Sequence, residues 1–464
     1  MRTETDSLGE FPVPRDALYG IHTARAMVNF PLSGQPCAPA LIRALSLVKL
    51  ACAQTNAGLG YLEAGIADAI AQACHELAEG QHRDAVLVDA LQGGAGTSLN
   101  MNVNEVIANR AVEILGGKRG DYRRVHPLHH VNLHQSTNDV YPTALKIAAI
   151  ESLHQLEKAI TALQMAVQSK ENEFTGILKV GRTQLQDACP MTLGAELSAW
   201  AEALGRDRWR VFKCEERLRV VNLGGTAIGT GLTAPRDYIF RVCEKLRDVT
   251  RLGLARAENL VDATQNADVF VEVSGILKAH AVNLFKISSD LRLLASGPHA
   301  GLGEIALPAV QVGSSVMPGK VNPVICEAVG QSALQVIAQD TAVTLAAQNG
   351  QLELNAFLPL VAHALLGNLG LLERTCTMFR ERCIEGLQAN AERCRELLEN
   401  SHAQVTALVP TLGYELAADV AHEAQHSGQT IRSVVLARGL IAESVLDRLL
   451  SANVMTALGY SKKQ

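Results

Sequence analysis

Five long stretches of helical sequence constrain the fold of this chain more than any other feature. Each carries an apolar stripe and runs for about 30 residues, which exceeds the usual length of helices in globular domains. Such a helix buries its stripe only against partners of similar length, so we expect the stretches to pack side by side as a five-helix bundle. They cover residues 139–174, 191–221, 266–296, about 323–349 and roughly 355–387.

The composition and the flanking sequence indicate an all-α protein of three domains. Aromatic residues make up only 4% of the chain, which is typical of packed helices rather than β-sandwiches. Residues 1–137 mix short helices with Gly and Pro, and helices become short again after about residue 393. We therefore predict an N-terminal mixed helical domain (1–137), a central bundle (138–392) and a small C-terminal helical domain (393–464).

Charge and hydropathy exclude several classes of partner. The net charge of −5 gives no electrostatic footprint for nucleic acid or an anionic membrane. The charged start of the chain lacks the pattern of a signal peptide, and the most apolar stretch, 358–373, is too short to span a bilayer. We therefore expect a cytoplasmic protein. Its ten scattered cysteines form no CxxC pair and are expected to be small core residues.

The segment GSSVMPGKVNP (313–323) has the composition of a shaped polar loop. Pro318 and Pro323 forbid a regular helix, and Gly313 and Gly319 permit backbone angles closed to other residues. Its lysine, asparagine and serines are groups that bind a carboxylate, although composition alone also allows a solvated turn.

Three further segments share this polar, glycine-rich character: GAGTSLNMNVNE (94–105), HQSTND (134–139) and GRTQLQDACPMTLG (181–194). Together with 313–323, they closely resemble the aspartase/fumarase superfamily, whose members add or remove a group across the double bond of fumarate. The resemblance covers essentially the whole chain. YGIHTARA, QSTND, LGGTAIGTGL and GRTQLQDA are more similar to the aspartate ammonia-lyase branch than to the fumarases.

The resemblance assigns roles to individual residues. It implies that Ser314 is the general base on a mobile loop, and that Ser315, Lys320 and Asn322 bind the carboxylate on which charge accumulates. A second group, for which helix capping or a satisfied turn is the alternative, would hold the other carboxylate and the leaving group: Thr97, Ser136, Thr137, Asn138 and Thr183.

Gln184 favours a carbon–nitrogen lyase. The fumarases have a histidine at this position, paired with a glutamate that matches Glu327. A hydroxyl group needs a proton donor in order to depart, and a glutamine cannot supply that proton. An ammonium group already carries its proton and needs no such donor. Gln184 would then bind substrate. Glu327 is either a carboxylate behind the site or an acid suited to the first turn of a helix.

The sequence departs from the family pattern in its histidines. In HPLHHVN (126–132), Leu128 and His129 replace an Asn–Asp pair associated with an accessory dicarboxylate site in the fumarases, and His134 stands where serine is common. Helical spacing of these histidines would allow a metal site, but Pro127 argues against a regular helix, and we predict none.

The resemblance therefore implies a homotetrameric aspartate ammonia-lyase without an organic cofactor, its sites shared between three subunits. The alternatives are a fumarate hydratase, a lyase for a substituted aspartate or N-substituted succinate, and a catalytically silent scaffold.

Overall fold

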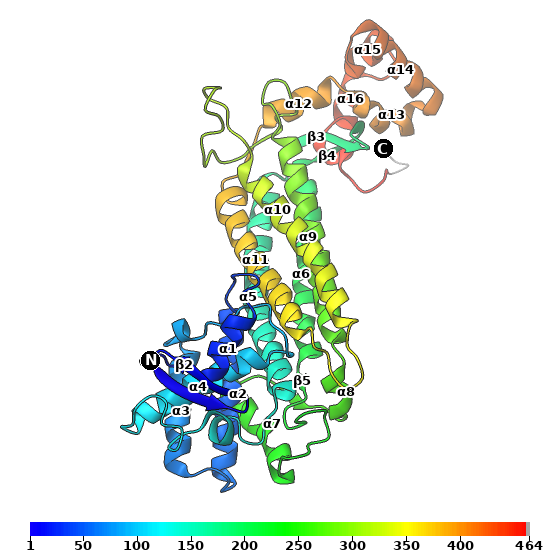
Figure 1. Ribbon diagram of the computed structural model, residues 1–464. Coiled ribbons are helices and arrows are strands. Elements are labelled where there is room, and N and C mark those ends of the chain that lie inside the picture. Colours follow the sequence, from blue (N-terminus) through cyan, green and yellow to red (C-terminus); the bar gives the residue numbers. More distant parts are fainter. Residues whose placement is uncertain (461–464) are drawn as a thin grey trace. The chain divides into compact units, whose positions relative to one another are not determined.

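The structure, a computed structural model, describes residues 1–460 of the chain. Its fold is all-α, with short two-stranded sheets between the helices (Figure 1). All five predicted long helices are present, which confirms the predicted fold class. They are α5 (Thr137–Glu173), α6 (Leu193–Leu218), α9 (Asp268–Leu294), α10 (Val324–Ala347) and α11 (Leu358–Phe379).

The contacts of the chain divide it into two compact units, and every long helix contributes one segment to each. Unit 1 comprises Met1–Lys158, Trp209–Ala281 and Ala333–Glu373, and unit 2 comprises Ala159–Arg208, Val282–Ser332 and Arg374–Gln464. The predicted division at residues 137 and 392 does not coincide with these units, and it stays a prediction.

Unit 1 combines short helices with one half of the bundle. Its bundle segments are joined by buried or half-buried polar contacts, such as the hydrogen bond from Ser274 on α9 to Asp340 on α10 at 2.8 Å. Its remaining elements are β1 (Arg2–Asp6), β2 (Gly9–Val13), α1 (Ile21–Asn29), α2 (Pro39–Gly58), α3 (Ala64–Ala78), α4 (Thr97–Ile114), β5 (Val220–Val221), α7 (Arg236–Thr250), β6 (Ala255–Arg256) and α8 (Leu260–Gln265).

Unit 2 holds the other half of the bundle, a β-hairpin and the C-terminal helices. Asn283 on α9 donates to both carboxylate oxygens of Asp207 on α6 at 2.9 Å, so α6 and α9 lie side by side. Its other elements are β3 (Leu178–Thr183), β4 (Gln186–Thr192), β7 (Ile305–Ala306), β8 (Gln388–Ala389), α12 (Ala391–Glu399), α13 (Val405–Leu412), α14 (Tyr414–Ser427), α15 (Ile431–Ala437), α16 (Glu443–Leu449) and α17 (Ala452–Met455).

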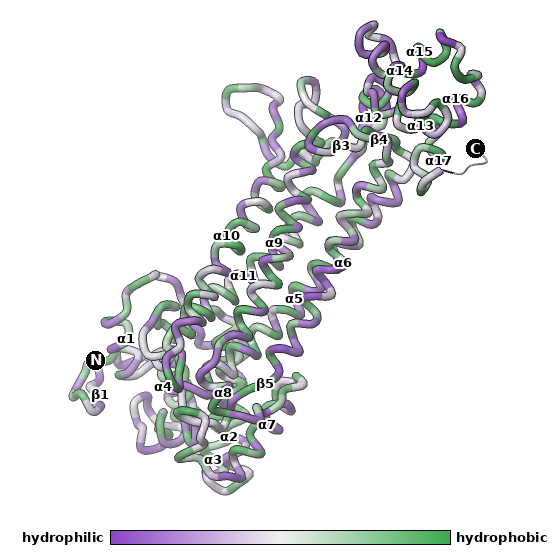
Figure 2. Tube along the Cα trace, turned by 90° about the vertical axis from the view of Figure 1, so that its right-hand side faces the viewer, coloured by the Kyte–Doolittle hydropathy of each residue, from purple (hydrophilic) through white to green (hydrophobic). Residues whose placement is uncertain are grey.

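Apolar and polar residues alternate along the long helices, as the sequence pattern predicts (Figure 2). Several large apolar side chains on these helices are nevertheless exposed, among them Trp209, Phe212, Phe285 and Leu334. Within residues 1–460, no helix combines the length and the apolar character needed to cross a membrane.

Candidate functional site

The 313–323 segment forms a loop closed by hydrogen bonds at its base. The Gly313 N–H donates to the Lys320 carbonyl at 3.0 Å, and the Asn322 side-chain amide donates to the Gly313 carbonyl at 2.7 Å. A Cβ at Gly313 would lie 2.3 Å from the Lys320 carbonyl oxygen, so only glycine fits there. Gly313 does not use a left-handed backbone conformation, because its φ is not positive. Gly319 does use one, with φ +81°.

Ser314 accepts two backbone hydrogen bonds inside this loop. Its Oγ receives the N–H groups of Val316 at 3.1 Å and Met317 at 3.0 Å. Donors aimed at a hydroxyl oxygen stabilise negative charge on that oxygen, which favours loss of its proton. These two bonds would favour ionisation of Ser314, and its role as the base stays a prediction.

The cation of the loop is available to a ligand. Lys320 and Ser315 are exposed, and within the described part of the chain the Lys320 ammonium forms no hydrogen bond or ion pair. Glu327 follows in the first turn of α10, where its backbone N–H donates to the Pro323 carbonyl at 3.1 Å. This placement agrees with an acid that complements the positive end of the helix.

Thr183 and Gln184 lie at the tip of the hairpin formed by β3 and β4. Thr183 pairs with Gln186, so the turn has only two residues, Gln184 and Leu185, with φ +53° and +62°. Both angles are positive, as a type I′ turn requires, and neither residue is a glycine. Left-handed backbone at residues with side chains is costly and concentrates at functional sites. The sequence does not predict this turn, because the usual Asn-Gly or Asp-Gly signal is absent.

A buried cluster of charges holds the base of this hairpin. Glu304, which is 0% exposed, lies 2.9 Å from Arg182 Nη1 and 3.3 Å from Lys179 Nζ. Lys179, 2% exposed, also lies 2.8 Å from Glu196 on α6. Two cations and two carboxylates thus neutralise one another and link β3 to the segment that ends in β7. These residues are far apart in the sequence, and no sequence motif predicted their association.

In unit 1, Ser136 caps the N-terminus of α5. Its Oγ accepts the Asn138 N–H at 3.2 Å, while Asp139 accepts the Ser136 N–H at 3.0 Å. Ser136 thus caps α5 through the N–H of the second helical residue, and Asp139 bonds back to it; the role of Ser136 in binding substrate stays a prediction. Asp139 was not among the predicted site residues, although the Ser-x-x-Asp spacing is a signal that identifies it.

The N-termini of α4 and α5 are joined through two buried side chains. Asn100, one turn after Thr97, donates to Thr137 Oγ1 at 3.0 Å. Thr97 is the first residue of α4 and is exposed, and its hydroxyl donates to the Gly94 carbonyl at 2.7 Å. The Asn100–Thr137 hydrogen bond brings two helix N-termini together, and the positive dipole ends of both helices favour an anion nearby.

Asn138 and Asp139 connect this region to the 223–232 loop. The Asn138 side chain donates to the Ala227 carbonyl at 2.7 Å, and Asp139 Oδ2 accepts the N–H groups of Gly224 at 3.2 Å and Thr226 at 3.0 Å. Burial raises the pKa of the Asp139 carboxyl to about 7, against the opposing effect of these N–H groups. Asp139 therefore ties Ser136 at the start of α5 to the 223–232 loop.

The buried Lys49 supports the same turn. Its ammonium donates to Asn132 and Gln135 at 2.8 Å each, and burial lowers its pKa to about 8. Asn132 also accepts from Asn100, so the cation is connected to the start of α5 through side chains alone. No sequence motif identified this lysine, which lies in the middle of α2.

The histidines are engaged in local contacts. Pro127–Val131 forms a single π-helical turn, in which His126 Nδ1 accepts the N–H of Leu128 at 3.1 Å. No group of three or more potential metal ligands occurs within residues 1–460. His134 packs its ring edge-on against Tyr61 and Tyr238, and its Nδ1 lies 2.7 Å from Asn56 Oδ1.

The predicted site residues are distributed between the two units. Unit 1 contains Thr97 and the 136–138 turn, and unit 2 contains the hairpin tip, the 313–323 loop and Glu327. Within unit 1, Thr97 and the 136–138 turn are linked through Asn100 and Thr137, and neither unit alone contains all the predicted residues.

Known proteins match this chain over nearly its whole length. Residues 9–338 match a family described as Lyase, and residues 405–457 match the fumarase C C-terminus. The chain is 46% identical to the aspartate ammonia-lyase of Bacillus subtilis, over 100% of this chain and 98% of the relative. It is 48% identical to the aspartate ammonia-lyase of Pseudomonas aeruginosa, over 98% and 97%. A crystal structure of a fumarate lyase:delta crystallin from Brucella melitensis bound to cobalt superimposes with a TM-score of 0.95 at 49% identity, covering 98% of this chain and 100% of that one.

Proposed function

This chain belongs to the lyase family within the aspartase/fumarase superfamily, and on that premise we propose that it is an aspartate ammonia-lyase. The reaction breaks a C–H bond at carbon 3 of L-aspartate and the C–N bond at carbon 2. A double bond forms between these carbons, and the products are fumarate and ammonia. The single observation that carries the assignment of the base is the pair of N–H groups at the Ser314 hydroxyl.

Ser314 removes the proton from carbon 3. The electron pair left behind is delocalised into the adjacent carboxylate, which then carries additional negative charge. An ordinary serine is too weak a base for this step, and the Val316 and Met317 N–H groups support its ionised form. The Lys320 ammonium, with Ser315 and the Asn322 amide, binds the charged carboxylate and lowers the barrier.

The other end of the substrate lies with the second group of residues. The paired N-termini of α4 and α5, with Thr97 and Thr137, attract the carbon-1 carboxylate. The protonated amino group takes the electron pair of the C–N bond and departs as neutral ammonia. No acid is therefore needed at the position of Gln184. Gln184 and Thr183 then orient the substrate by hydrogen bonds.

The site needs the 313–323 loop and hairpin tip together with Thr97 and the 136–138 turn. Such a site is compatible with assembly from several subunits. We propose the homotetramer with shared sites that the family resemblance implies, together with a cytoplasmic location. The exposed Trp209, Phe212, Phe285 and Leu334 on the long helices support association, because apolar side chains on bundle helices are stabilised by contact with a second copy.

Substrate choice is tested by following fumarate absorbance with L-aspartate and with L-malate. Formation of fumarate and ammonia from L-aspartate supports the proposal. Turnover of L-malate alone would instead assign the chain as a fumarate hydratase. This alternative is motivated by the match of residues 405–457 to the fumarase C C-terminus. His134 contacts Asn56 and two tyrosines, so its position gives no specific support to a substituted aspartate as the substrate.

The base is tested with Ser314→Ala, and Ser427→Ala on the exposed face of α14 is the matched control. We expect Ser314→Ala to lower kcat at least 1,000-fold while the variant keeps its fold and binds dicarboxylate, in line with loss of the reacting base. Ser427→Ala should retain wild-type turnover. Near-normal kcat in Ser314→Ala would remove Ser314 from the base role.

A further inference from the structure

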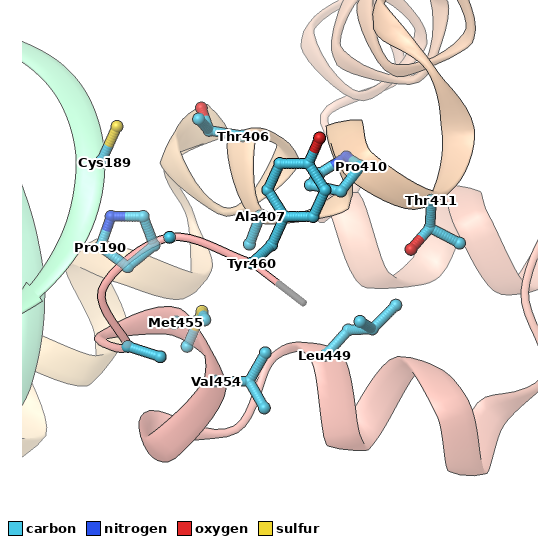
Figure 3. A pocket seen from close by; sticks show the side chains of 12 residues that line it. Cys189, Pro190, Thr406, Ala407, Pro410, Thr411, Leu449, Val454, Met455 and Tyr460 are labelled. Carbon is cyan, nitrogen blue, oxygen red and sulfur yellow. The ribbon is translucent and has the colours of Figure 1, made fainter. Parts of the chain in front are cut away.

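A pocket of about 670 Å³ lies in unit 2 between the hairpin and the C-terminal helices. Cys189 and Pro190 of β4 stand at one side of it, Pro410 belongs to α13, and Leu449 and Met455 come from the last two helices (Figure 3). Its volume falls within the range of sites that hold small organic ligands. None of the residues predicted to bind the dicarboxylate lines this pocket.

The described lining is uncharged and mostly apolar. It contains no Asp, Glu, Lys, Arg or His among residues 1–460, so it offers no counter-charge for aspartate or fumarate. Apolar surface comes from prolines and aliphatic side chains, with the aromatic ring of Tyr460 beside them. The hydroxyls of Thr406, Thr411 and Tyr460 are polar groups that could fix an orientation. This lining fits a neutral molecule with an apolar body and few hydrogen-bonding groups.

The lining of the pocket includes residues from two small hydrophobic cores. Leu449 belongs to the core of the C-terminal helices, together with Leu408. Met455 packs against the other core, which contains Val180 of β3 and Leu398 of α12. An occupant therefore contacts the C-terminal helices on one side and the base of the hairpin on the other. Its binding would change how the two cores sit against each other.

The wall of the pocket reaches the hairpin where its register is irregular. Val180 pairs with Pro190 and Arg182 with Asp187, so β4 carries one extra residue between these pairs. Cys189 lies in this bulge, and its carbonyl oxygen would be 2.8 Å from a Cβ added to Gly181. Thr183 follows two residues after Gly181. Cys189 and Pro190 are therefore connected to the hairpin tip by only a few residues of paired strand.

We propose that this pocket is an effector site for a neutral, largely apolar small molecule, whose binding alters the lyase reaction through the β3–β4 hairpin. The effect on the reaction rests on the proposed function, whereas binding itself does not.

Cys189 offers a direct readout of occupancy. It is the one exposed thiol among the ten cysteines, and the other nine are buried. We would titrate the full-length protein with N-phenyl-1-naphthylamine, a neutral dye that fluoresces in apolar surroundings, and measure the rate at which N-ethylmaleimide modifies Cys189 by peptide mass spectrometry. We expect saturable binding of one dye per chain and at least fivefold slower modification at saturation.

A filled-pocket variant and a matched control locate the bound dye. Ala407→Phe places a ring in the pocket and should weaken dye binding at least tenfold, while Ala421→Phe on α14, which does not line the pocket, should bind dye as wild type does. If Ala407→Phe does not fold, protection of Cys189 in the wild type decides the matter alone. Absence of saturable binding, or binding without protection of Cys189, would overturn the site.

The regulatory part is measured as the initial rate of fumarate formation with and without saturating dye. We expect KM or kcat for L-aspartate to change at least twofold in the wild type and in Ala421→Phe. Unchanged rates with a fully occupied pocket would overturn the effector role. A protein that binds dye and protects Cys189 but does not deaminate L-aspartate would instead contradict the proposed function and leave the binding site standing.

Discussion

Ser136 and Asp139 cap the start of α5 from both directions, with Asp139 Oδ1 3.0 Å from the Ser136 nitrogen. The second oxygen of Asp139 holds the 223–232 loop through Gly224 and Thr226, so a single buried carboxyl fixes two backbone segments that bear on the proposed site. The residues assigned to substrate are consequently placed by a group that never needs to touch it.

Asp139→Asn should destabilise the protein most strongly at low pH. Both oxygens of Asp139 accept N–H groups, and each can still accept when one of them carries the proton. Asparagine instead has a single acceptor oxygen and an NH2 group, so the change leaves a buried donor unpaired and costs about 1–3 kcal/mol. Burial raises the pKa of Asp139 from 3.8 to about 7, so its stabilising contribution is complete below pH 3.8 and is lost as pH rises through 7.

The difference in urea midpoint between wild type and Asp139→Asn should therefore shrink from pH 5 to pH 8. Both proteins would be unfolded in urea at each pH, with circular dichroism as the probe. A difference that grows toward pH 8 would contradict the raised pKa and would indicate that the N–H groups dominate over burial.

Leu185→Gly should stabilise the hairpin tip. Leu185 has φ +62° and is 69% exposed, so glycine relieves the left-handed strain with little loss of buried apolar area. We expect a gain of about 0.5–1 kcal/mol in the free energy of unfolding. Leu185→Ala is the control, because it removes the side chain and keeps the strain. An equal gain in both variants would mean that the exposed leucine, and not the backbone, is the cause.

Two glycines of the 313–323 loop should respond differently to alanine. A Cβ at Gly313 would overlap the Lys320 carbonyl, whereas Gly319 has no atom within 4 Å and only a positive φ to accommodate. Gly313→Ala should therefore displace Lys320 and lower kcat at least tenfold. Gly319→Ala should cost about 1 kcal/mol of local strain and lower kcat less. Equal kcat values in the two variants would show that loop closure at Gly313 does not matter for turnover.

The sequence predicted the helices that an apolar pattern repeats over many turns. It did not predict features that depend on a few local or long-range contacts. The stretch 139–174 became α5 (Thr137–Glu173), because an apolar stripe repeated over ten turns leaves little freedom in the length of a helix. The stretch 355–387 was predicted as one helix, whereas α11 ends at Phe379 and a π-helical turn, Arg380–Ile384, follows it.

The candidate site shows the same division. Its residue types were recognisable because polar, glycine-rich segments are rare in a helical chain, and the two N–H groups at Ser314 agree with the loop that the sequence predicted. The supporting residues were not recognisable. Lys49 and Glu304 look like ordinary helix and loop residues until folding removes them from water, and their partners lie 80 or more positions away in the chain.

The cluster around Glu304 provides a final prediction, concerning coupled charges. Glu304→Gln would leave Lys179 and Arg182 without their shared buried carboxylate and should cost about 3–5 kcal/mol. Lys179→Met alone should also destabilise, because Glu304 then keeps only Arg182. The double variant removes one charge of each sign, so it should cost at least about 1 kcal/mol less than the sum of the single changes. Urea unfolding of all four proteins measures this coupling. Additive costs would mean that Lys179 is held by Glu196 alone and that Glu304 serves Arg182 only.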